Sequence, residues 1–316
     1  MRLIDAAEVR ANLSYELAIP AVRAAMIALS AGQTRQLLRS ILHFQDGRMF
    51  GVMPGALGEA AAFGAKILSV FPKNFEIGRP SHQGVVLTFD PVTGELACVA
   101  DAQSITAIRT AAASAVATQA LARADADRLA LLGYGEQAET HVHAISKVRP
   151  LRQVTVWGRA PARAQAFAAR LRAELGLPVT AAETALAAVA EADIVCTLTP
   201  ATAPILEGAW LRPGTHVNLV GASFAAQRET DDALVARARF IADHREGVLA
   251  QGGEFLHAKA AGLVGDEHVA GEIGQVLSGA IPGRRSGEEI TAYKSLGHVV
   301  QDLASVQALL TMPPPR

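Results

Sequence analysis

The sequence has few cysteines, few aromatic residues and almost no net charge. Its two cysteines, Cys98 and Cys196, lie far apart with no histidine cluster beside either, which excludes a disulfide framework and a zinc site. Lysine and arginine total 29 against 30 acidic residues, so the basic surface of a nucleic-acid-binding protein is missing too. Long apolar runs are also lacking, because the uncharged stretch 110–122 is shorter than the ~18 residues that a membrane span needs. We expect no metal, nucleic-acid or membrane partner.

The N-terminus lacks a targeting pattern. Its first ten residues, MRLIDAAEVR, are charged and contain no long apolar core, so we expect no secretory signal. Reduced thiols and the missing signal together predict a cytoplasmic protein. Apolar side chains, by contrast, make up half of the 316 residues. At roughly 150 residues per domain, this length predicts two domains, each with its own core.

Hydrophobic patterning divides the chain into parts of different character. Up to about residue 110, short strand-like runs alternate with turn signals such as DPVTG, which predicts a largely antiparallel sheet. Residues 104–126 are rich in alanine and predict one long helix. Helices and strands then alternate, which predicts a parallel sheet with helices on both faces. Residues 246–287 are expected to be mostly helix or loop, residues 290–310 to form a final helix, and the terminal PPPR to fray.

A glycine loop connects a buried strand at 128–132 to a helix at 137–148. It reads LLGYGEQA over residues 131–138, a G-x-G-x-x-A pattern in the setting that a dinucleotide site requires. Gly133 would permit the tight turn, Gly135 the close approach of a pyrophosphate, and Ala138 the close packing of the helix. The helix start, with Glu136 and Gln137, would offer N–H groups to the phosphates. A glycine-rich turn without a ligand is the alternative.

The end of the next strand indicates which dinucleotide is bound. An NAD site usually has Asp or Glu there, about 20 residues after the glycines, but residues 151–173 contain no acid. Instead, Trp157 precedes Arg159, and Arg163 follows one helical turn later. A guanidinium suits a 2′-phosphate, so NADP(H) is preferred, with NAD(H) possible. Both arginines could instead be solvated surface charges.

Basic residues also occur in apolar surroundings in the first part of the chain. Arg109 lies near the start of the alanine-rich helix with no acid in the turns downstream, although a buried guanidinium needs a partner. A carboxylate ligand would serve, and a pair with Asp101 or another acid is the alternative. Lys66 and Arg39 lie in or beside apolar strands, where such residues are usually solvated. His82, in a loop before a strand, either faces a cleft or is inert.

Several segments give the chain a resemblance to the ornithine cyclodeaminase and mu-crystallin family. The similar segments, spread over nearly the whole chain, are GAKILSVFP, PSHQGVVLTFDPVTGELACVADAQSITAIRTAAAS, GYGEQA, VNLVGAS and AYKSLGHVVQD. The resemblance implies a homodimer with an α/β fold. Residues 113–289 would form a Rossmann NADP-binding domain, and residues 1–112, completed by 290–316, an α+β substrate-binding and dimerisation domain. It also implies an α-amino or α-imino acid substrate, whose carboxylate would be held at Arg39, Lys66 and Arg109.

The resemblance adds further positions beside the cofactor, which are Ser81, Gln83, Thr110, Thr197, Thr199, Gly221, Ser223 and Ser295. One position separates two branches of the family. True ornithine cyclodeaminases carry an Asp where this chain has Ser223, and a hydroxyl cannot replace a carboxylate as a base at neutral pH. The mu-crystallin branch, which reduces cyclic ketimines and favours NADPH, resembles this chain at Gly221-Ala222-Ser223, at Ser81-His82-Gln83 and after Trp157.

These features predict NADPH-dependent reduction of a cyclic imino acid, Δ1-pyrroline-2-carboxylate or Δ1-piperideine-2-carboxylate, to proline or pipecolate. Arg39, Lys66 and Arg109 would orient the substrate through its carboxylate. Lys66, a water held by Ser223, or His82 would protonate the imine nitrogen. The alternatives are an ornithine or lysine cyclodeaminase with tightly bound NAD, alanine dehydrogenase-like amination of a 2-oxo acid, and an NADPH-dependent binding protein without turnover.

Overall fold

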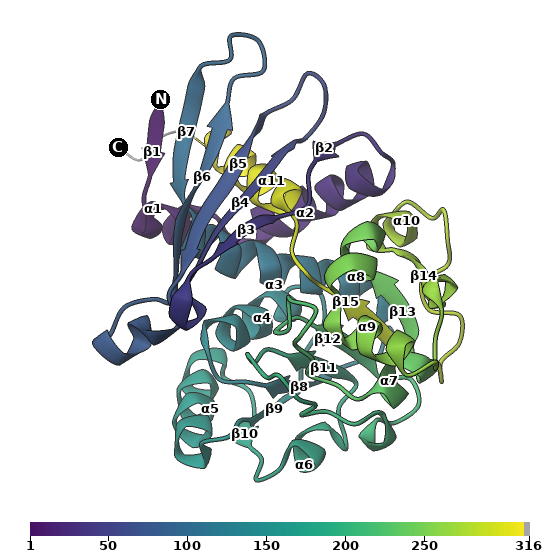
Figure 1. Cartoon of the computed structure of the whole chain (residues 1–316). Coiled ribbons are helices and arrows are strands. Elements are labelled where there is room, and N and C mark those ends of the chain that lie inside the picture. Colours follow the sequence, from purple (N-terminus) through teal and green to yellow (C-terminus); the bar gives the residue numbers. More distant parts are fainter. Residues whose placement is uncertain (313–316) are drawn as a thin grey trace. The chain divides into compact units, whose positions relative to one another are not determined.

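The computed structural model of the chain describes residues 1–312, so the predicted fraying of the terminal PPPR lies outside it. The chain forms two compact units (Figure 1). Unit 1 comprises residues 1–110 and the segment from His298 onward, and unit 2 comprises Ala111–Gly297. No single helix of residues 1–312 is long and apolar enough to cross a membrane. The helices Ala6–Asn12 and Tyr15–Ser30 reach that length only together, and a bend of 92° separates them.

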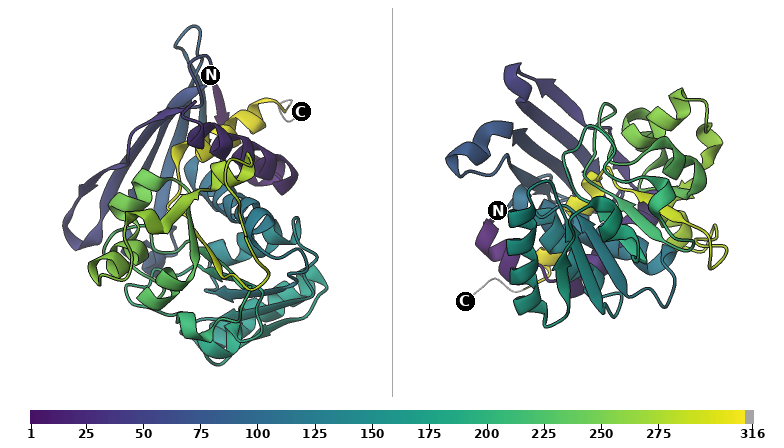
Figure 2. Two further views of the ribbon diagram at one scale, coloured as in Figure 1. Left: turned by 90° about the vertical axis from the view of Figure 1, so that its right-hand side faces the viewer. Right: turned by 90° about the horizontal axis from the view of Figure 1, so that it is seen from below.

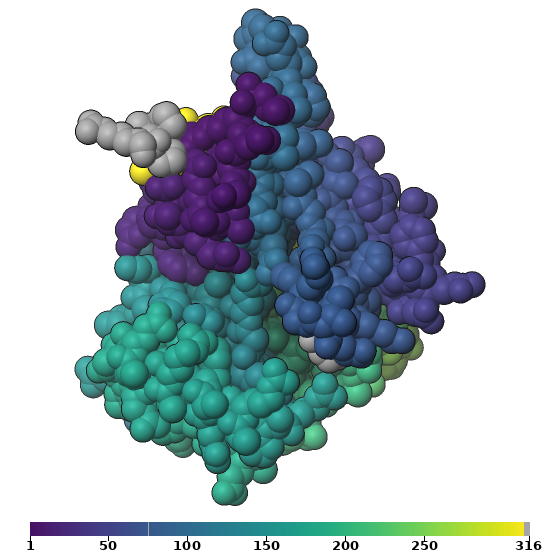
Figure 3. Space-filling view, turned by 90° about the vertical axis from the view of Figure 1, so that its left-hand side faces the viewer, coloured from purple at the N-terminus to yellow at the C-terminus, as the bar shows by residue number. Residues whose placement is uncertain are grey.

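Unit 1 is built on a seven-stranded sheet in the order β1-β7-β6-β5-β4-β2, with β3 also paired to β4. All neighbours are antiparallel except β1 and β7. The strands are β1 (Arg2–Ile4), β2 (Arg35–Gln36), β3 (Ser40–His43), β4 (Met49–Ala56), β5 (Phe63–Val70), β6 (His82–Phe89) and β7 (Leu96–Asp101). The turn between β6 and β7 is the blue tip at the top of Figure 3. The largely antiparallel prediction for this part agrees with the register.

Helices α1 (Ala6–Asn12), α2 (Tyr15–Ser30) and α11 (Val299–Leu310) complete unit 1. Helix α11 packs against α2 and against strands β4, β5 and β6. It is buried on nearly all sides, and Gln301, Asp302 and Ser305 are among its fully buried residues. A helix buried on all sides is part of a core, so the polar residues buried within it need partners. This helix therefore brings polar groups from the end of the chain onto the sheet.

Unit 2 contains an eight-stranded sheet, parallel throughout, in the order β10-β9-β8-β11-β12-β15-β13-β14 (Figure 2). Its strands are β8 (Arg128–Leu132), β9 (Gln153–Trp157), β10 (Val179–Ala181), β11 (Ile194–Thr197), β12 (His216–Leu219), β13 (Arg239–Ala242), β14 (Val269–Glu272) and β15 (Thr291–Lys294). Helices α4 (Glu136–Ser146), α5 (Pro161–Leu175), α6 (Ala185–Val189), α7 (Asp232–Arg237), α8 (Arg245–Gln251), α9 (Gly253–Ala260) and α10 (Ile273–Leu277) connect them. Two apolar clusters fill the layers between sheet and helices, as expected for a doubly wound α/β unit.

Two boundaries differ from the prediction. The predicted final helix at 290–310 is wrong in its first part, because Thr291–Lys294 forms β15 inside the parallel sheet and α11 begins only at Val299. Gly297, with φ at +80°, lies in the turn that separates β15 from α11. Residues 290–297 therefore belong to unit 2, whereas the prediction grouped them with residues 1–112. The alanine-rich helix α3 (Ala102–Leu121) is shorter than the predicted 104–126 and crosses the boundary between units.

Candidate functional site

The glycine loop of unit 2 has two glycines with different requirements. Gly133 has φ at +135°, and a Cβ there would lie 2.8 Å from the carbonyl oxygen of Leu198, so the fold itself demands glycine. Gly135 has an extended backbone at the N-cap of α4, and a Cβ there would meet no atom within 4 Å. Steric packing within the chain therefore does not explain why position 135 is a glycine. Ala138 is fully buried, which agrees with close packing of helix and strand.

The loop also offers polar groups to a ligand. The N-terminus of α4 carries backbone N–H groups and a partial positive charge suited to phosphate. Within residues 1–312, the side-chain oxygen of Gln137 is buried without a hydrogen-bond partner. Glu136 and Gln137 form the first helical positions after Gly135. The open space over Gly135 and the backbone N–H groups at the start of α4 fit the pyrophosphate of a dinucleotide, whereas the Gln137 oxygen is an acceptor and would need another partner.

The two arginines after β9 have different surroundings. Arg159 is exposed and makes no hydrogen bond or ion pair with any residue that the structure describes. The Arg163 guanidinium lies 5.3 Å from the ring centre of Tyr134 in the glycine loop. That ring packs on Gly158, where a Cβ would lie 2.2 Å from it. Arg163 is thus tied to the loop, whereas Arg159, two residues after Trp157, keeps a free guanidinium.

The loops after β11 and β12 are fastened by a carboxylate that the sequence analysis missed. Glu229 is fully buried and accepts from the backbone N–H and hydroxyl of Thr199 and from the N–H of Gly221, each at 2.7 Å. Burial raises its pKa, although the hydrogen bonds from Thr199 oppose the rise. Its sequence surroundings, QRETDD, are typical of an exposed helix start, so no local signal marks it as buried.

The other cofactor positions expected in unit 2 lie at strand ends. Thr197 ends β11 and Ser295 follows β15, and both are buried. Ser223 is half-buried in the loop after β12, where its N–H faces the Gln227 side chain at 3.4 Å. The turn after Ser295 is held by Asp243, whose carboxylate accepts from the next two backbone N–H groups at 2.7 and 2.8 Å. All these residues follow the carboxyl ends of parallel strands, where open α/β sheets bind ligands.

Unit 1 contains a buried charged cluster that joins β5, α3 and α11. One oxygen of Asp302 accepts from Lys66 Nζ and from Arg109 Nε, each at 3.1 Å. Lys66 also donates to the Thr106 hydroxyl at 2.5 Å, and Arg109 Nη1 donates to the Gln301 side chain at 2.7 Å. The side chains of Lys66 and Arg109 are 5% exposed and that of Asp302 is not exposed at all. This buried cluster holds two cations and one anion.

Burial and neighbouring charges shift the pKa values of Lys66 and Asp302. Burial lowers the pKa of Lys66 to about 8. The Asp302 charge opposes this fall, while the charges of Arg109 and Arg39 add to it. For Asp302, burial opposes ionisation, but the Arg109 and Lys66 charges prevail and hold its pKa below the usual value. At neutral pH the cluster therefore carries a net positive charge.

The structure agrees with the alternative given for Arg109, a pair with an acid elsewhere in the chain. The sequence showed no acid in its own helical turns, yet Asp302 pairs with it from 193 positions away. Asp101 is not the partner, because its side chain accepts the Ser104 N–H at the start of α3. A signal was present, since Asp302 is the one charged residue of α11 among mostly apolar neighbours, and buried acids are normally paired.

The remaining candidates of unit 1 lie around this cluster or away from it. Arg39 is half-buried between β2 and β3, and its charge acts on Lys66. His82 is the first residue of β6 rather than part of a loop, and its Nδ1 lies 2.9 Å from the Ser81 hydroxyl. Although its side chain is exposed, desolvation by its neighbours, and then the Lys66 charge, lower its pKa.

Gln83 and Thr110 complete the set in unit 1. Gln83 is exposed on β6 and pairs with Ser69. Thr110 is buried in α3 next to Arg109. These positions, which the family resemblance places beside the cofactor, therefore belong to the same unit as the charged cluster.

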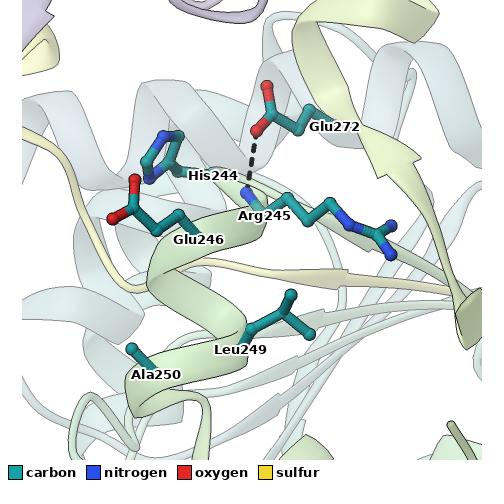
Figure 4. Close-up of a pocket in the computed structure, with 6 residues that line it drawn as sticks. All are labelled: His244, Arg245, Glu246, Leu249, Ala250 and Glu272. Atoms are coloured by element: carbon teal, nitrogen blue, oxygen red, sulfur yellow. Dashed lines mark hydrogen bonds between the residues drawn. The ribbon is translucent and has the colours of Figure 1, made fainter. Parts of the chain in front are cut away.

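Two surface features outside these sites carry little chemistry. A shallow cavity of about 540 Å³ in unit 2 is lined by His244, Arg245, Glu246, Leu249, Ala250 and Glu272 (Figure 4). Its groups are already engaged: the Arg245 N–H donates to Glu272, and the guanidinium donates to two backbone carbonyls. Glu139, His143 and Glu174 approach one another on the surface, but Arg170 donates to both Glu139 oxygens at 2.8 Å. Neither feature involves a predicted site residue.

Comparison with known proteins gives matches over nearly the whole chain. The model of the ornithine cyclodeaminase/mu-crystallin family matches residues 2–310. Mouse ketimine reductase mu-crystallin is 36% identical over 309 residues, which cover 96% of this chain and 95% of that protein. The structure of Thermococcus litoralis Δ1-pyrroline-2-carboxylate reductase with NADH and L-proline has a TM-score of 0.95 at 31% identity, covering 98% and 97%. An archaeal alanine dehydrogenase dimer with bound NAD has a TM-score of 0.92 at 28% identity, covering 98% and 94%.

Proposed function

The chain belongs to the ornithine cyclodeaminase/mu-crystallin family, and on this basis we propose that it is an oxidoreductase that reduces the C=N bond of a cyclic imino acid. The substrate is Δ1-pyrroline-2-carboxylate or Δ1-piperideine-2-carboxylate, the product is proline or pipecolate, and NADPH is the preferred reductant. The observation that carries this proposal is the buried cluster of Lys66, Arg109 and Asp302, whose net positive charge suits one carboxylate.

The cluster retains hydrogen-bond donors for that carboxylate. Arg109 uses Nε and Nη1 within the chain, but its Nη2 donates to no residue in the range 1–312. The Lys66 ammonium has three donors, of which Thr106 and Asp302 take two. Arg109 Nη2 would bind the carboxylate directly, while Lys66 would attract it by its charge and direct its one remaining N–H toward the imine nitrogen. Arg39 would add its positive charge from the β2–β3 segment.

The residues of unit 2 fit a nicotinamide dinucleotide, which supplies the hydride when bound. The open space over Gly135 and the start of α4 would receive the pyrophosphate. Glu136, Gln137, Thr197, Thr199, Gly221 and Ser295 would line the rest of the cofactor. Ser81, Gln83 and Thr110 are the further cofactor positions that the family resemblance implies. The free guanidinium of Arg159 favours a 2′-phosphate and hence NADPH. The relatives with bound NADH or NAD keep NAD(H) as the second option.

Among the candidate proton donors, Lys66 is the best suited to the imine nitrogen. Burial lowers its pKa to about 8, so it is mostly protonated at neutral pH and gives up its proton more readily than an ordinary lysine. The pKa of His82 is lowered, so this ring is mostly neutral. A water held by the Ser223 hydroxyl remains the other source.

Reductive amination of a 2-oxo acid is the second candidate, because the archaeal alanine dehydrogenase has a TM-score of 0.92 with this chain. The same carboxylate-binding cluster would serve that reaction. A cyclodeaminase is less well supported, because this chain has Ser223 at the position where the family resemblance implies an Asp in true ornithine cyclodeaminases. A binding protein without turnover would not need a near-neutral lysine.

The test of the proposed function follows NADPH and NADH absorbance in the presence of each cyclic imino acid, and separately with pyruvate and ammonia. We expect rapid oxidation with an imino acid and a preference for NADPH. Turnover with pyruvate and ammonia alone would establish the second candidate. No oxidation with any of these compounds, together with ammonia release from ornithine, would replace the reductase by a cyclodeaminase.

Substituting Arg159 tests the cofactor preference. We expect Arg159→Ala to raise the KM for NADPH by about 10-fold or more, because one charge-assisted contact to phosphate is lost, and to leave the KM for NADH nearly unchanged. Arg152→Ala is the matched control, since Arg152 is also exposed and precedes the other end of β9, where it pairs with Asp127. An equal rise for NADPH in both variants, or a rise for NADH in Arg159→Ala, would contradict the assignment.

We also propose that the enzyme is a cytoplasmic homodimer formed through unit 1. Large apolar side chains are exposed in this unit, including Leu37 (69%), Leu42 (62%), Phe44 (51%) and Ile77 (69%). Several exposed apolar residues in one unit are typical of a contact surface, and the archaeal alanine dehydrogenase is a dimer. Cys98 and Cys196 are free and buried, which suits a reducing compartment.

A further inference from the structure

We propose that Asp302 is a positioning residue that fixes the charge and direction of the Lys66 ammonium, and through it the pH range in which the enzyme works. The proposal rests on the function proposed above, in which a protonated Lys66 faces the substrate. It goes beyond that function by giving a role to a residue to which the proposed function assigns none. Asp302 has no exposed surface, and its second carboxylate oxygen is buried without a partner among residues 1–312.

The contacts of Asp302 and Thr106 fix the direction of the Lys66 ammonium. Its bonded oxygen lies 3.1 Å from Lys66 Nζ and 3.1 Å from Arg109 Nε, so it bridges the two cations. The Thr106 hydroxyl accepts the second Lys66 proton at 2.5 Å and is itself held by the Ala102 carbonyl. Two of the three ammonium donors are thereby fixed in direction. The third must point along the remaining tetrahedral direction, which fixes where a substrate can receive it.

The charges around Lys66 explain why an anion is needed there. The groups that face it are Arg109 from α3, Arg39 from the β2–β3 segment, His82 from β6 and Asp302 from α11. Arg109 and Arg39 are positive, and Asp302 is the single negative charge of this set. A buried ammonium beside other cations loses its proton readily, whereas an opposite charge within hydrogen-bonding distance keeps it. Asp302 therefore opposes three effects at once, which are burial and the charges of two arginines.

Asp302→Asn separates this role from a merely structural one, because it removes the charge and keeps the shape. Without the anion the pKa of Lys66 should fall below its value of about 8, so Lys66 loses its proton at a lower pH. We expect the alkaline fall of kcat/KM to move toward lower pH by about one unit or more. A variant that only loosens the fold would lose activity at every pH without moving this transition.

Two further variants serve as controls. Gln301→Met removes a neutral hydrogen bond to Arg109 from the neighbouring position of α11, so kcat/KM should fall while the alkaline transition stays in place. Asp302→Glu keeps the negative charge and should bring the transition back toward that of the wild type. The dissociation constant for NADPH, measured by fluorescence, reports whether each variant is folded.

A titration by NMR gives a readout that needs no substrate. The chain has only five lysines, at positions 66, 73, 147, 259 and 294, so 13C-labelled lysine gives few signals, and Lys66→Met assigns the relevant one. We expect its midpoint to lie near pH 8 in the wild type and lower in Asp302→Asn. Equal midpoints in the two proteins would overturn this inference. Absence of imino acid turnover in the wild type would instead refute the proposed function, so the two failures are distinguishable.

Discussion

Arg109→Ala is expected to lower kcat/KM for the cyclic imino acid by about 10²–10⁴-fold, because a buried charge-assisted contact to the substrate carboxylate is lost. Its neighbour Lys66 alone cannot orient the carboxylate in two directions. Affinity for NADPH should change by less than about threefold, because the Arg109 guanidinium would contact the substrate carboxylate and not the dinucleotide. Initial rates and NADPH binding by fluorescence measure the two quantities separately.

Arg109→Lys is the matched variant for this experiment. It keeps a positive charge beside Asp302 but cannot also reach Gln301, because an ammonium lacks the planar fork of a guanidinium. We expect an intermediate loss of kcat/KM and a melting temperature closer to that of the wild type than for Arg109→Ala. If Arg109→Ala weakens NADPH binding as much as it weakens turnover, Arg109 has a structural role and does not bind substrate.

The charged cluster also marks the limit of what the sequence could predict. Lys66 and Asp302 are 236 positions apart, and no local pattern pairs them. Both cations are recognisable in the sequence, because lysine and arginine are conspicuous in apolar segments. Asp302 is not recognisable in the same way, because its partners Lys66 and Arg109 lie on β5 and α3, which only the folded chain brings beside α11. The error in the predicted helix at 290–310 has a separate cause. The strand Thr291–Lys294 is only four residues long, too short to display the alternation that distinguishes a strand from a buried helix.

Local chemistry was predicted far better than long-range pairing. The order of strand, glycine loop and helix around Gly133 follows from a pattern of eight residues, because turn geometry and helix capping act between neighbours. Glu229 is the opposite case, since its partners Thr199 and Gly221 belong to two separate loops that only the folded sheet brings together. A buried carboxylate of this kind becomes recognisable only when its partners are known.

The second large effect is expected for Gly135→Ala, which tests whether a ligand occupies the space over the glycine loop. A methyl group there meets no atom of the chain within 4 Å, and the backbone is extended, so alanine is compatible with the fold. Loss of the glycine N-cap should cost at most about 1 kcal/mol of folding free energy. We nevertheless expect the dissociation constant for NADPH to rise by about 10–100-fold, because the methyl group would displace the pyrophosphate.

Gly133→Ala is the control variant, because it tests a glycine that the fold itself requires. At that position φ is +135° and a Cβ would lie 2.8 Å from the Leu198 carbonyl, so the substitution should destabilise the folded chain itself. Thermal unfolding should therefore separate the variants, with a melting temperature near that of the wild type for Gly135→Ala and a clearly lower one for Gly133→Ala. Normal NADPH affinity in a well-folded Gly135→Ala variant would mean that no phosphate lies over this glycine. The dinucleotide would then have to be held by other residues, and the fingerprint would be a turn required only by the fold.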